Sequence, residues 1–328
     1  MGLKLLALAA VFAAAASPAE FVAARQQPDG GFAERGVRSD PALTAWAVLG
    51  LRSAGRAPAR PAGPYLRDAP IQDTTDLALR ILALRALGEP TADFVERLER
   101  QRRPDGRIGA LVNSTIWGVL ALPRGQRAAV RYLLRQQRRS GGWSWAPNGA
   151  PDSNDTAATI QALRWNGVRG RPIRRGLGYI RRLTAPNGGV RLAPGRPPDA
   201  QSTAWAIQAY VAAGTRPPAA AFRFLSSLRR PEGSYRYSRR YAVTPALVTA
   251  QVLPALARMP YPLAAAATQP ASGRTSRPSA TSSSISPFRQ YQGQLNHLGT
   301  SRSGATTAAR TAATTSEPRS MWLSLVPG

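Results

Sequence analysis

The sequence predicts one all-helical domain whose helical hairpins close into a double ring, an α/α toroid. Two observations predict the ring. A pair of interleaved repeats runs through residues 20–262, and the two helices of each repeat differ in polarity. A third observation, a change of composition after about residue 262, limits the domain. Self-similarity at a fixed period is typical of repeat architectures.

The N-terminal segment has the pattern of a secretory signal. Lys4 is its only cation, residues 5–16 carry no charge, and small residues follow at 17–19. The apolar run is shorter than the roughly 20 residues that span a bilayer. A buried first helix is the alternative. We therefore expect residues 1–19 to be a signal peptide, and the protein to be secreted or otherwise extracytoplasmic, without a transmembrane anchor.

The first repeat pairs an aromatic residue with a glycine nine positions later and usually a large side chain two positions after that. In one copy, Val130, Leu133 and Leu134 share a face while arginines point elsewhere, as in an amphipathic helix. The glycine ends the helix because it readily adopts positive φ. We expect these helices to form the outer ring. The copies are Phe21–Gly30–Phe32, Tyr132–Gly141–Trp143, Tyr179–Gly188–Val190 and Phe224–Gly233–Tyr235, with a degraded copy at Arg97–Gly106–Ile108.

The second repeat opens apolar stretches at threonines, each followed seven positions later by Leu or Tyr. A stretch such as 44–51 is apolar or small nearly all round, so it must be buried on most sides. An inner ring satisfies this requirement, whereas an open solenoid would expose one side of each helix. We therefore expect about six hairpins around a central cavity. The markers are Thr44, Thr75, Thr115, Thr156, Thr203 and Thr249.

Composition excludes several kinds of site. The chain has no cysteine, which removes disulfides, thiolate zinc sites and cysteine nucleophiles. The single histidine, His297, lies in the tail, so a histidine-based metal site or a Ser-His-Asp triad in the core is excluded. We expect no metal and no cofactor.

The net charge of +27 is almost entirely arginine. We interpret it as solvent-facing cations from a GC-rich coding sequence rather than a nucleic-acid interface, because no basic stripe alternates with stacking aromatics. Peripheral contact with anionic envelope polymers is a further option.

The first repeat carries a resemblance to a known family. In residues 132–143, the spacing of Gln137, a glycine and Trp143 resembles the QW motif of squalene and oxidosqualene cyclases. Residues 21–32 have the same pattern with Phe32 in place of Trp. The chain thus resembles a secreted, bacterial-type member of the prenyltransferase and squalene-cyclase (terpene-cyclase) repeat family, in which the Gln and Trp tie adjacent repeats together. The wider group also includes cobalamin carriers and complement thioester domains, so the fold does not fix the function.

The resemblance implies chemistry that the sequence supports only in part. Type II terpene cyclases protonate an alkene with the middle acid of an Asp-x-Asp-Asp-Thr-Ala motif. Here residues 152–157 read Asp-Ser-Asn-Asp-Thr-Ala, and the amide of Asn154 cannot supply that proton. The Cys and His zinc ligands of protein prenyltransferases and the thioester Cys are absent. A displaced acid is the alternative, either Asp155 or Asp73, which we place at the offset of Asn154.

Polar residues recur near the starts of the inner helices, and three tryptophans follow them. We interpret them as the rim and lining of an apolar cavity that binds a hydrophobic or amphipathic ligand, isoprenoid- or cobalamin-like. The alternatives are helix capping for the polar residues and packing between the two rings for the tryptophans. The expected rim is Asp40, Asp73, Asn113, Asp152, Asn154, Asp199 and Gln201, with Trp46, Trp117 and Trp205.

The sequence therefore favours an extracytoplasmic ligand-binding repeat protein. A terpene-cyclase- or prenyltransferase-type enzyme with a displaced acid is the first alternative, and a structural envelope protein with an arginine-rich convex face is the second. Residues 263–328 are rich in Ser, Thr, Ala, Gly and Arg without helical periodicity, and we expect them to be disordered. A reading-frame artefact would explain the same composition.

Overall fold

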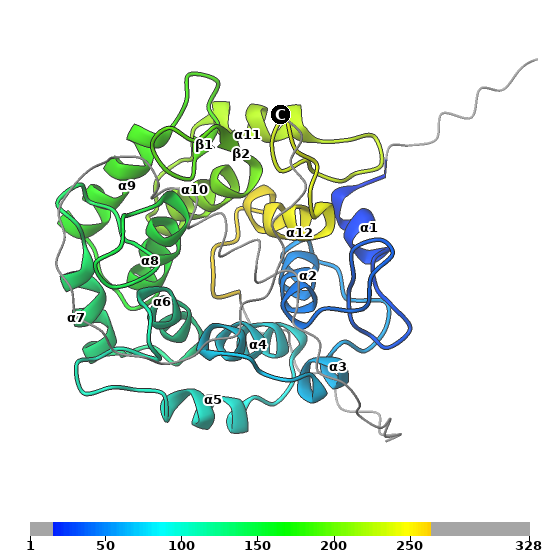
Figure 1. Cartoon of the computed structure of the whole chain (residues 1–328), viewed down its shortest axis with the longest axis horizontal. Coiled ribbons are helices and arrows are strands. Elements are labelled where there is room, and N and C mark those ends of the chain that lie inside the picture. The colour runs from blue at the N-terminus through cyan, green and yellow to red at the C-terminus, as the bar shows by residue number, and fades with distance from the viewer. Residues whose placement is uncertain (1–15, 264–328) are drawn as a thin grey trace, which may run out of the picture.

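The computed structural model describes residues 16–263, in which helices alternate between an inner and an outer ring (Figure 1). The inner helices are α2 (Pro41–Ser53), α4 (Thr74–Leu87), α6 (Val112–Ala121), α8 (Ser153–Trp165), α10 (Ala200–Ala212) and α12 (Pro245–Leu256). The outer helices are α1 (Pro18–Ala23), α3 (Gly63–Asp68), α5 (Ala92–Glu99), α7 (Arg127–Gln136), α9 (Arg171–Leu183) and α11 (Ala219–Leu228). Strands β1 (Val190–Arg191) and β2 (Pro198–Asp199) form a short antiparallel pair.

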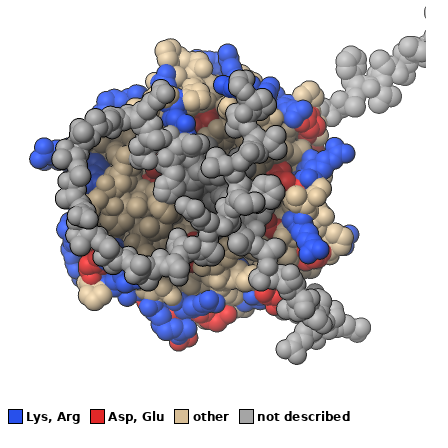
Figure 2. Space-filling view, in the orientation of Figure 1, with Lys and Arg blue, Asp and Glu red and all other residues tan. Residues whose placement is uncertain are grey.

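The inner ring is closed. Each inner helix contacts the next along the chain, and α12 contacts α2. The predicted α/α toroid of about six hairpins is therefore confirmed. Arginine side chains surround the ring, and a hollow lies inside it (Figure 2).

Burial separates the two rings as the sequence predicted. In α10 the residues 200–210 are all buried, whereas α9 buries one face that includes Ile173, Leu177 and Ile180. Helices that are apolar on all sides are shielded on all sides only if the row of hairpins closes on itself. The closed ring thus follows from the composition of the inner helices.

The glutamines of the QW-like motif tie adjacent repeats together, as the family resemblance implied. The Gln137 side-chain amide donates to the carbonyl oxygens of Gly141 and Pro172, each at 2.9 Å, and Pro172 lies in the first turn of α9. Gln26 makes the equivalent bond to Arg60 at 2.9 Å, ahead of α3. Each glutamine thereby fixes the next outer helix to the turn before it.

The turn glycines are required by both conformation and space. Gly141 has φ of 93°, and a Cβ there would lie 2.5 Å from the carbonyl oxygen of Arg175 in the next outer helix. Gly233 has φ of 90°, and a Cβ there would lie 2.7 Å from the carbonyl oxygen of Ser17. The last glycine turn therefore packs on the start of the first helix, as the other glycine turns pack on the next outer helix.

The seam between the first and last repeats has its own polar contact. The carboxylate of Glu34, in the loop before α2, accepts hydrogen bonds from the backbone N–H groups of Ala246 at 2.9 Å and Leu247 at 3.1 Å. These groups open α12, whose N-cap residue supplies no side-chain bond. Burial raises the pKa of Glu34.

The described residues, 16–263, begin inside the predicted signal peptide and end at the first residue of the predicted tail. Helix α1 begins at Pro18, within the segment 1–19 predicted as a signal peptide, and residues 1–15 lie outside the described residues. Residues 264–328 of the predicted tail also lie outside them. Within 16–263, no helix is long and apolar enough to cross a bilayer.

Candidate functional site

Four of the expected rim carboxylates cap inner helices. Each accepts a hydrogen bond from the backbone N–H three residues later, at 2.8 or 2.9 Å, which is the capping interpretation of the sequence pattern. They are Asp40 at α2, Asp73 at α4, Asp152 at α8 and Asp199 at α10.

The predicted register of α4 is wrong by two residues. Asp73 is the N-cap of α4, so it is equivalent to Asp152 and not to Asn154. The residue equivalent to Asn154 is Thr75, and the residue equivalent to Asp155 is Asp76. The spacing pattern misassigns Thr75 as a repeat marker, because the chain between α3 and α4 lacks the glycine turn that precedes the other inner helices.

The three tryptophans meet at the ring axis. Trp46, Trp117 and Trp205 occupy the same position on alternate inner helices, α2, α6 and α10. Their ring centroids are 5.3 to 5.8 Å apart in edge-on pairs, and each tryptophan is at most 5% exposed. Packing between the two rings is therefore excluded as their role. We call these three side chains the tryptophan layer.

Tyr261 fills the middle of the tryptophan layer. Its ring lies 5.7 to 6.1 Å from all three tryptophans, and it is 3% exposed. It lies in the segment after α12, which turns into the ring (Figure 1). Its backbone N–H donates to the side-chain oxygen of Gln161 on α8 at 2.8 Å. Gln161 is one turn closer to the C-terminal ends of the inner helices than the tryptophan layer, so the segment closes the ring from that end.

A polar arc of side chains links three consecutive inner helices on the N-terminal side of the tryptophan layer. The Thr75 hydroxyl on α4 donates to the side-chain oxygen of Asn113 on α6 at 3.2 Å. The Asn113 amide donates to Asp155 on α8 at 2.6 Å. Asp155 in turn interacts with Asp152, its helix cap. We call Thr75, Asn113, Asp152 and Asp155 the polar arc.

The two carboxyl groups of the polar arc share a proton. Burial and the neighbouring Asp155 raise the pKa of Asp152 well above its usual range. Burial also raises the pKa of Asp155, opposed by hydrogen bonds from Asp152 and Asn113. Two adjacent buried carboxyls cannot both ionise readily, so Asp152 stays neutral and donates to Asp155. The arrangement keeps one carboxyl protonated above the usual pH range of an aspartate, so it holds an acidic proton.

The remaining expected rim residues have other partners. Asn154 is partly exposed and accepts a hydrogen bond from the hydroxyl of Ser153 at 3.3 Å, so the motif position of the acid holds an amide. The Gln201 amide donates to the side-chain oxygen of Gln251 on α12 at 2.9 Å. The indole N–H of Trp205 donates to the same oxygen at 3.3 Å. Gln201 and Trp205 are thus joined away from the polar arc.

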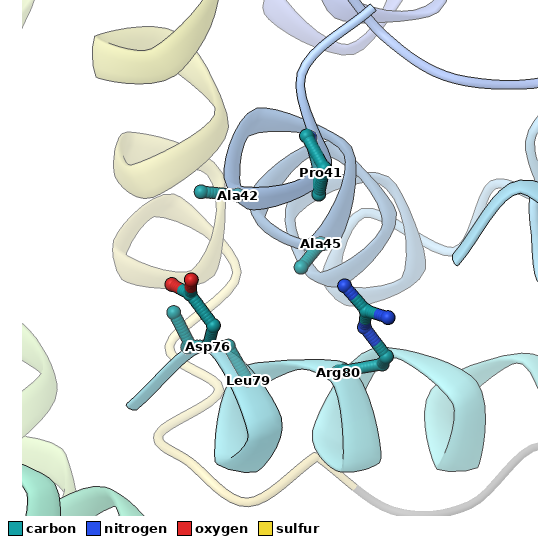
Figure 3. Close-up of a pocket in the computed structure, with 6 residues that line it drawn as sticks. All are labelled: Pro41, Ala42, Ala45, Asp76, Leu79 and Arg80. Carbon is teal, nitrogen blue, oxygen red and sulfur yellow. The ribbon is translucent and has the colours of Figure 1, made fainter. Parts of the chain in front are cut away.

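Sequence reasoning missed Asp76 and Arg80 on α4 (Figure 3). With Ala42, Ala45 and neighbouring side chains they line a small cavity between α2 and α4, with a volume of about 10 Å³. Burial raises the pKa of Asp76 and lowers that of Arg80 to about 10. The correct register of α4 would have revealed Asp76, because it places that residue in line with Asp155.

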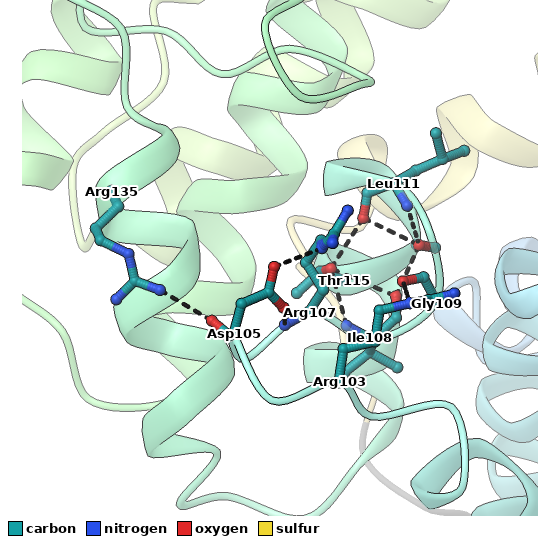
Figure 4. Close-up of polar contacts among 9 residues, drawn as sticks. Arg103, Asp105, Arg107, Ile108, Gly109, Leu111, Thr115 and Arg135 are labelled. Carbon is teal, nitrogen blue, oxygen red and sulfur yellow. Dashed lines mark hydrogen bonds and ion pairs between the residues drawn. The ribbon is translucent and has the colours of Figure 1, made fainter.

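Apart from Thr75, the threonine markers lie between the two rings, outside the site. Figure 4 shows Thr115, in the first turn of α6, beside Ile108 of the preceding outer turn. Its hydroxyl accepts from the N–H of Ile108 at 3.1 Å and donates to the carbonyl oxygen of Leu111 at 2.9 Å. Thr156 accepts in the same way from the N–H of Trp143 at 2.9 Å. In every repeat except that of α4, the recurring threonine therefore joins the outer turn to its inner helix.

Within residues 16–263, no group of three or more Asp, Glu or His side chains is arranged to hold a metal ion.

No family model matches the chain. Over 204 residues it is 30% identical to drimenyl diphosphate synthase from Streptantibioticus cattleyicolor, a match that covers 49% of this chain and 38% of that protein.

Solved structures agree with the sequence comparison. The type II terpene cyclase MstE from Scytonema superposes with a TM-score of 0.59 and 17% identity, over 74% of this chain and 95% of that one. This chain has the fold of the terpene cyclases. The chain also superposes on ent-copalyl diphosphate synthase from Streptomyces platensis. The TM-score is 0.52 and the identity 19%, over 66% of this chain and 50% of that one.

The predicted resemblance to terpene cyclases is thereby confirmed in sequence and in fold. The chain spans about two-fifths of the length of the curated relative that it matches. A shared fold does not determine the reaction, which depends on the residues of the site. Here the amide of Asn154 occupies the motif position of the acid.

Proposed function

We propose that this protein binds a hydrophobic or amphipathic small molecule of isoprenoid type inside its inner ring, outside the cytoplasm. The observation that carries the proposal is the pairing of the tryptophan layer with the polar arc on its N-terminal side. An apolar wall with a few converging polar groups is the usual make-up of a small-molecule site. A variant of MstE in complex with geranylgeranyl dihydroxybenzoate, its substrate, supports the ligand class for this fold.

The polar arc favours a ligand with a neutral oxygen at its polar end. Asp152 and Asp155 are buried carboxyls that share a proton, and the Asn113 amide is already engaged by Asp155. An anionic head group would be repelled by the carboxyl pair, whereas the hydroxyl of an alcohol can donate a hydrogen bond to a remaining lone pair of these carboxyl oxygens. We therefore expect isoprenoid alcohols to bind more tightly than the corresponding diphosphates.

Native mass spectrometry of the purified protein tests the proposal. A retained isoprenoid-like mass that a Trp117→Ala substitution removes would support it. A retained corrinoid mass would favour a cobalamin-like ligand. An empty ring that takes up no added isoprenoid alcohol would contradict it.

A cyclase-type enzyme is the second candidate function, favoured by the raised pKa of Asp152 and Asp155. A neutral carboxylic acid beside an apolar cavity is the group that would protonate an alkene. Incubation with polyprenyl substrates tests this candidate. Product that forms with the wild type and disappears with both Asp152→Asn and Asp155→Asn would establish the enzyme, and absence of product would leave binding alone.

A further inference from the structure

We infer that Tyr261 is the floor of the ligand cavity and limits the length of the isoprenoid chain that the ring accepts. The inference rests on the proposed function and adds the residue that sets its specificity. Tyr261 belongs to no repeat helix, yet its ring lies within 6.1 Å of all three tryptophans at the axis. A chain that enters between the inner helices must stop at this four-ring contact or displace it.

An upper limit on the depth that a ligand can reach follows from helix geometry. Trp46 lies six residues after its cap Asp40, and Trp205 lies six residues after Asp199. At 1.5 Å per residue, the tryptophan layer is about 9 Å below the rim. A ligand that enters from the N-terminal side has at most this depth above Tyr261, which excludes a long extended chain.

The segment around Tyr261 is held firmly from the C-terminal side. Its N–H is bonded to Gln161 at 2.8 Å, and Leu263 beyond it is also buried. By contrast, no hydrogen-bond partner among the described residues reaches its phenol oxygen. The ring of Tyr261, rather than its hydroxyl, therefore closes the cavity.

The test measures dissociation constants of geraniol, farnesol and geranylgeraniol, each one isoprene unit longer than the last, for the full-length protein by calorimetry. With the wild type, the gain in affinity per unit stops once the chain reaches Tyr261, so geranylgeraniol gains nothing over farnesol. Tyr261→Ala opens the space beneath the tryptophan layer and tightens geranylgeraniol binding by about tenfold. Tyr261→Phe keeps the ring and leaves the wild-type preference unchanged.

A matched control separates depth from general loosening. Tyr235 is as deeply buried as Tyr261 but lies in a separate apolar cluster with Ile207, Phe224 and Val252. Tyr235→Ala should lower stability without altering the preference for chain length. A shift in preference with this variant as large as that with Tyr261→Ala would overturn the inference.

The outcomes separate the inference from the proposed function. If the wild type binds all three alcohols and its affinity rises equally with every added isoprene unit, the inference is refuted while the proposed function stands. This result does not depend on whether any variant folds. Binding with a preference that Tyr261→Ala leaves unchanged does the same. If no alcohol binds to the wild type or to any variant, the proposed function fails and the inference fails with it.

Discussion

The inner ring contains two kinds of helix that alternate around the axis. Helices α2, α6 and α10 each place a tryptophan at the axis, whereas α4, α8 and α12 place Leu79, Ala158 and Gln251 at the equivalent position. The tryptophan-free helices α4 and α8 instead carry acids one turn earlier, the half-buried Asp76 and the buried Asp155. The comparison teaches that one repeat pattern serves two tasks: α2, α6 and α10 fill the axis, whereas α4 and α8 place an acid one turn inside the helix start.

The largest expected effect is on the tryptophan-bearing helices. Trp117→Ala removes contacts with Trp46, Trp205 and Tyr261, so it should lower the free energy of unfolding by about 3–5 kcal/mol. Leu79→Ala at the equivalent position of α4 should cost less, about 2–3 kcal/mol. Urea unfolding measures both. Equal losses would show that the two kinds of helix do not differ at the axis.

Asp199 extends the comparison, because it is a buried acid on a tryptophan-bearing helix. Burial raises its pKa to about 7, although Ser202 and Tyr237 donate hydrogen bonds to it. Since the pKa is higher in the folded state, stability is lost as pH rises from about 4 through about 7, by roughly 4 kcal/mol from this group. Asp199→Asn keeps the cap and should flatten that part of the profile, measured as unfolding free energy at several pH values.

An exposed acid provides the control for that profile. Asp105 lies on an outer turn, where hydrogen bonds and the charge of Arg107 hold its pKa below the usual range. Asp105→Asn should leave the slope between pH 4 and 8 unchanged. A flat wild-type profile would contradict the assignment of Asp199.

The two acids of the tryptophan-free helices should respond differently to the same change. Asp155→Leu leaves the Asn113 amide and Asp152 without their partner, so it should cost about 1–3 kcal/mol. Asp76→Leu introduces the residue that α2 has at this position, Leu43. It removes the desolvation cost of the carboxyl, but also the acceptor of the Gln72 N–H and the charge beside Arg80, so stability should change by less than about 1 kcal/mol. Thermal unfolding of the two variants side by side measures the contrast. A loss above about 2 kcal/mol for Asp76→Leu would mean that its carboxyl has a structural partner of comparable importance.

The smallest expected effect concerns α1, which has no tryptophan or inner-ring role. Ser17 caps this helix in a reciprocal pair with Glu20, at 3.1 and 2.7 Å. Ser17→Ala should cost about 1 kcal/mol in unfolding free energy. Mass spectrometry of secreted protein should also find Ser17 retained, because removal of residues up to 19 would delete this cap. A mature chain that begins after Ala19 with undiminished stability would contradict both expectations.

The period of the sequence made the ring predictable, and departures from the period hid parts of the site. Regular spacing located Trp46, Trp117 and Trp205, but a helix that is apolar all round does not reveal which side faces the axis. Because the glycine turn before α4 is missing, the spacing pattern predicts the register of α4 wrongly and does not single out Asp76. Tyr261 had no signal at all, since it follows the last helix and belongs to no repeat.

The closing contact between Glu34 and the start of α12 joins residues 212 positions apart in the chain. An open row of hairpins can grow by adding neighbours, whereas this ring gains its final interface only when the first and last hairpins meet. Contacts of such separation carry a large entropy cost before they return any stability, which slows folding. Until the two ends dock, the apolar faces of α2 and α12 that form this interface are exposed to solvent. The chain is most prone to aggregation during that interval.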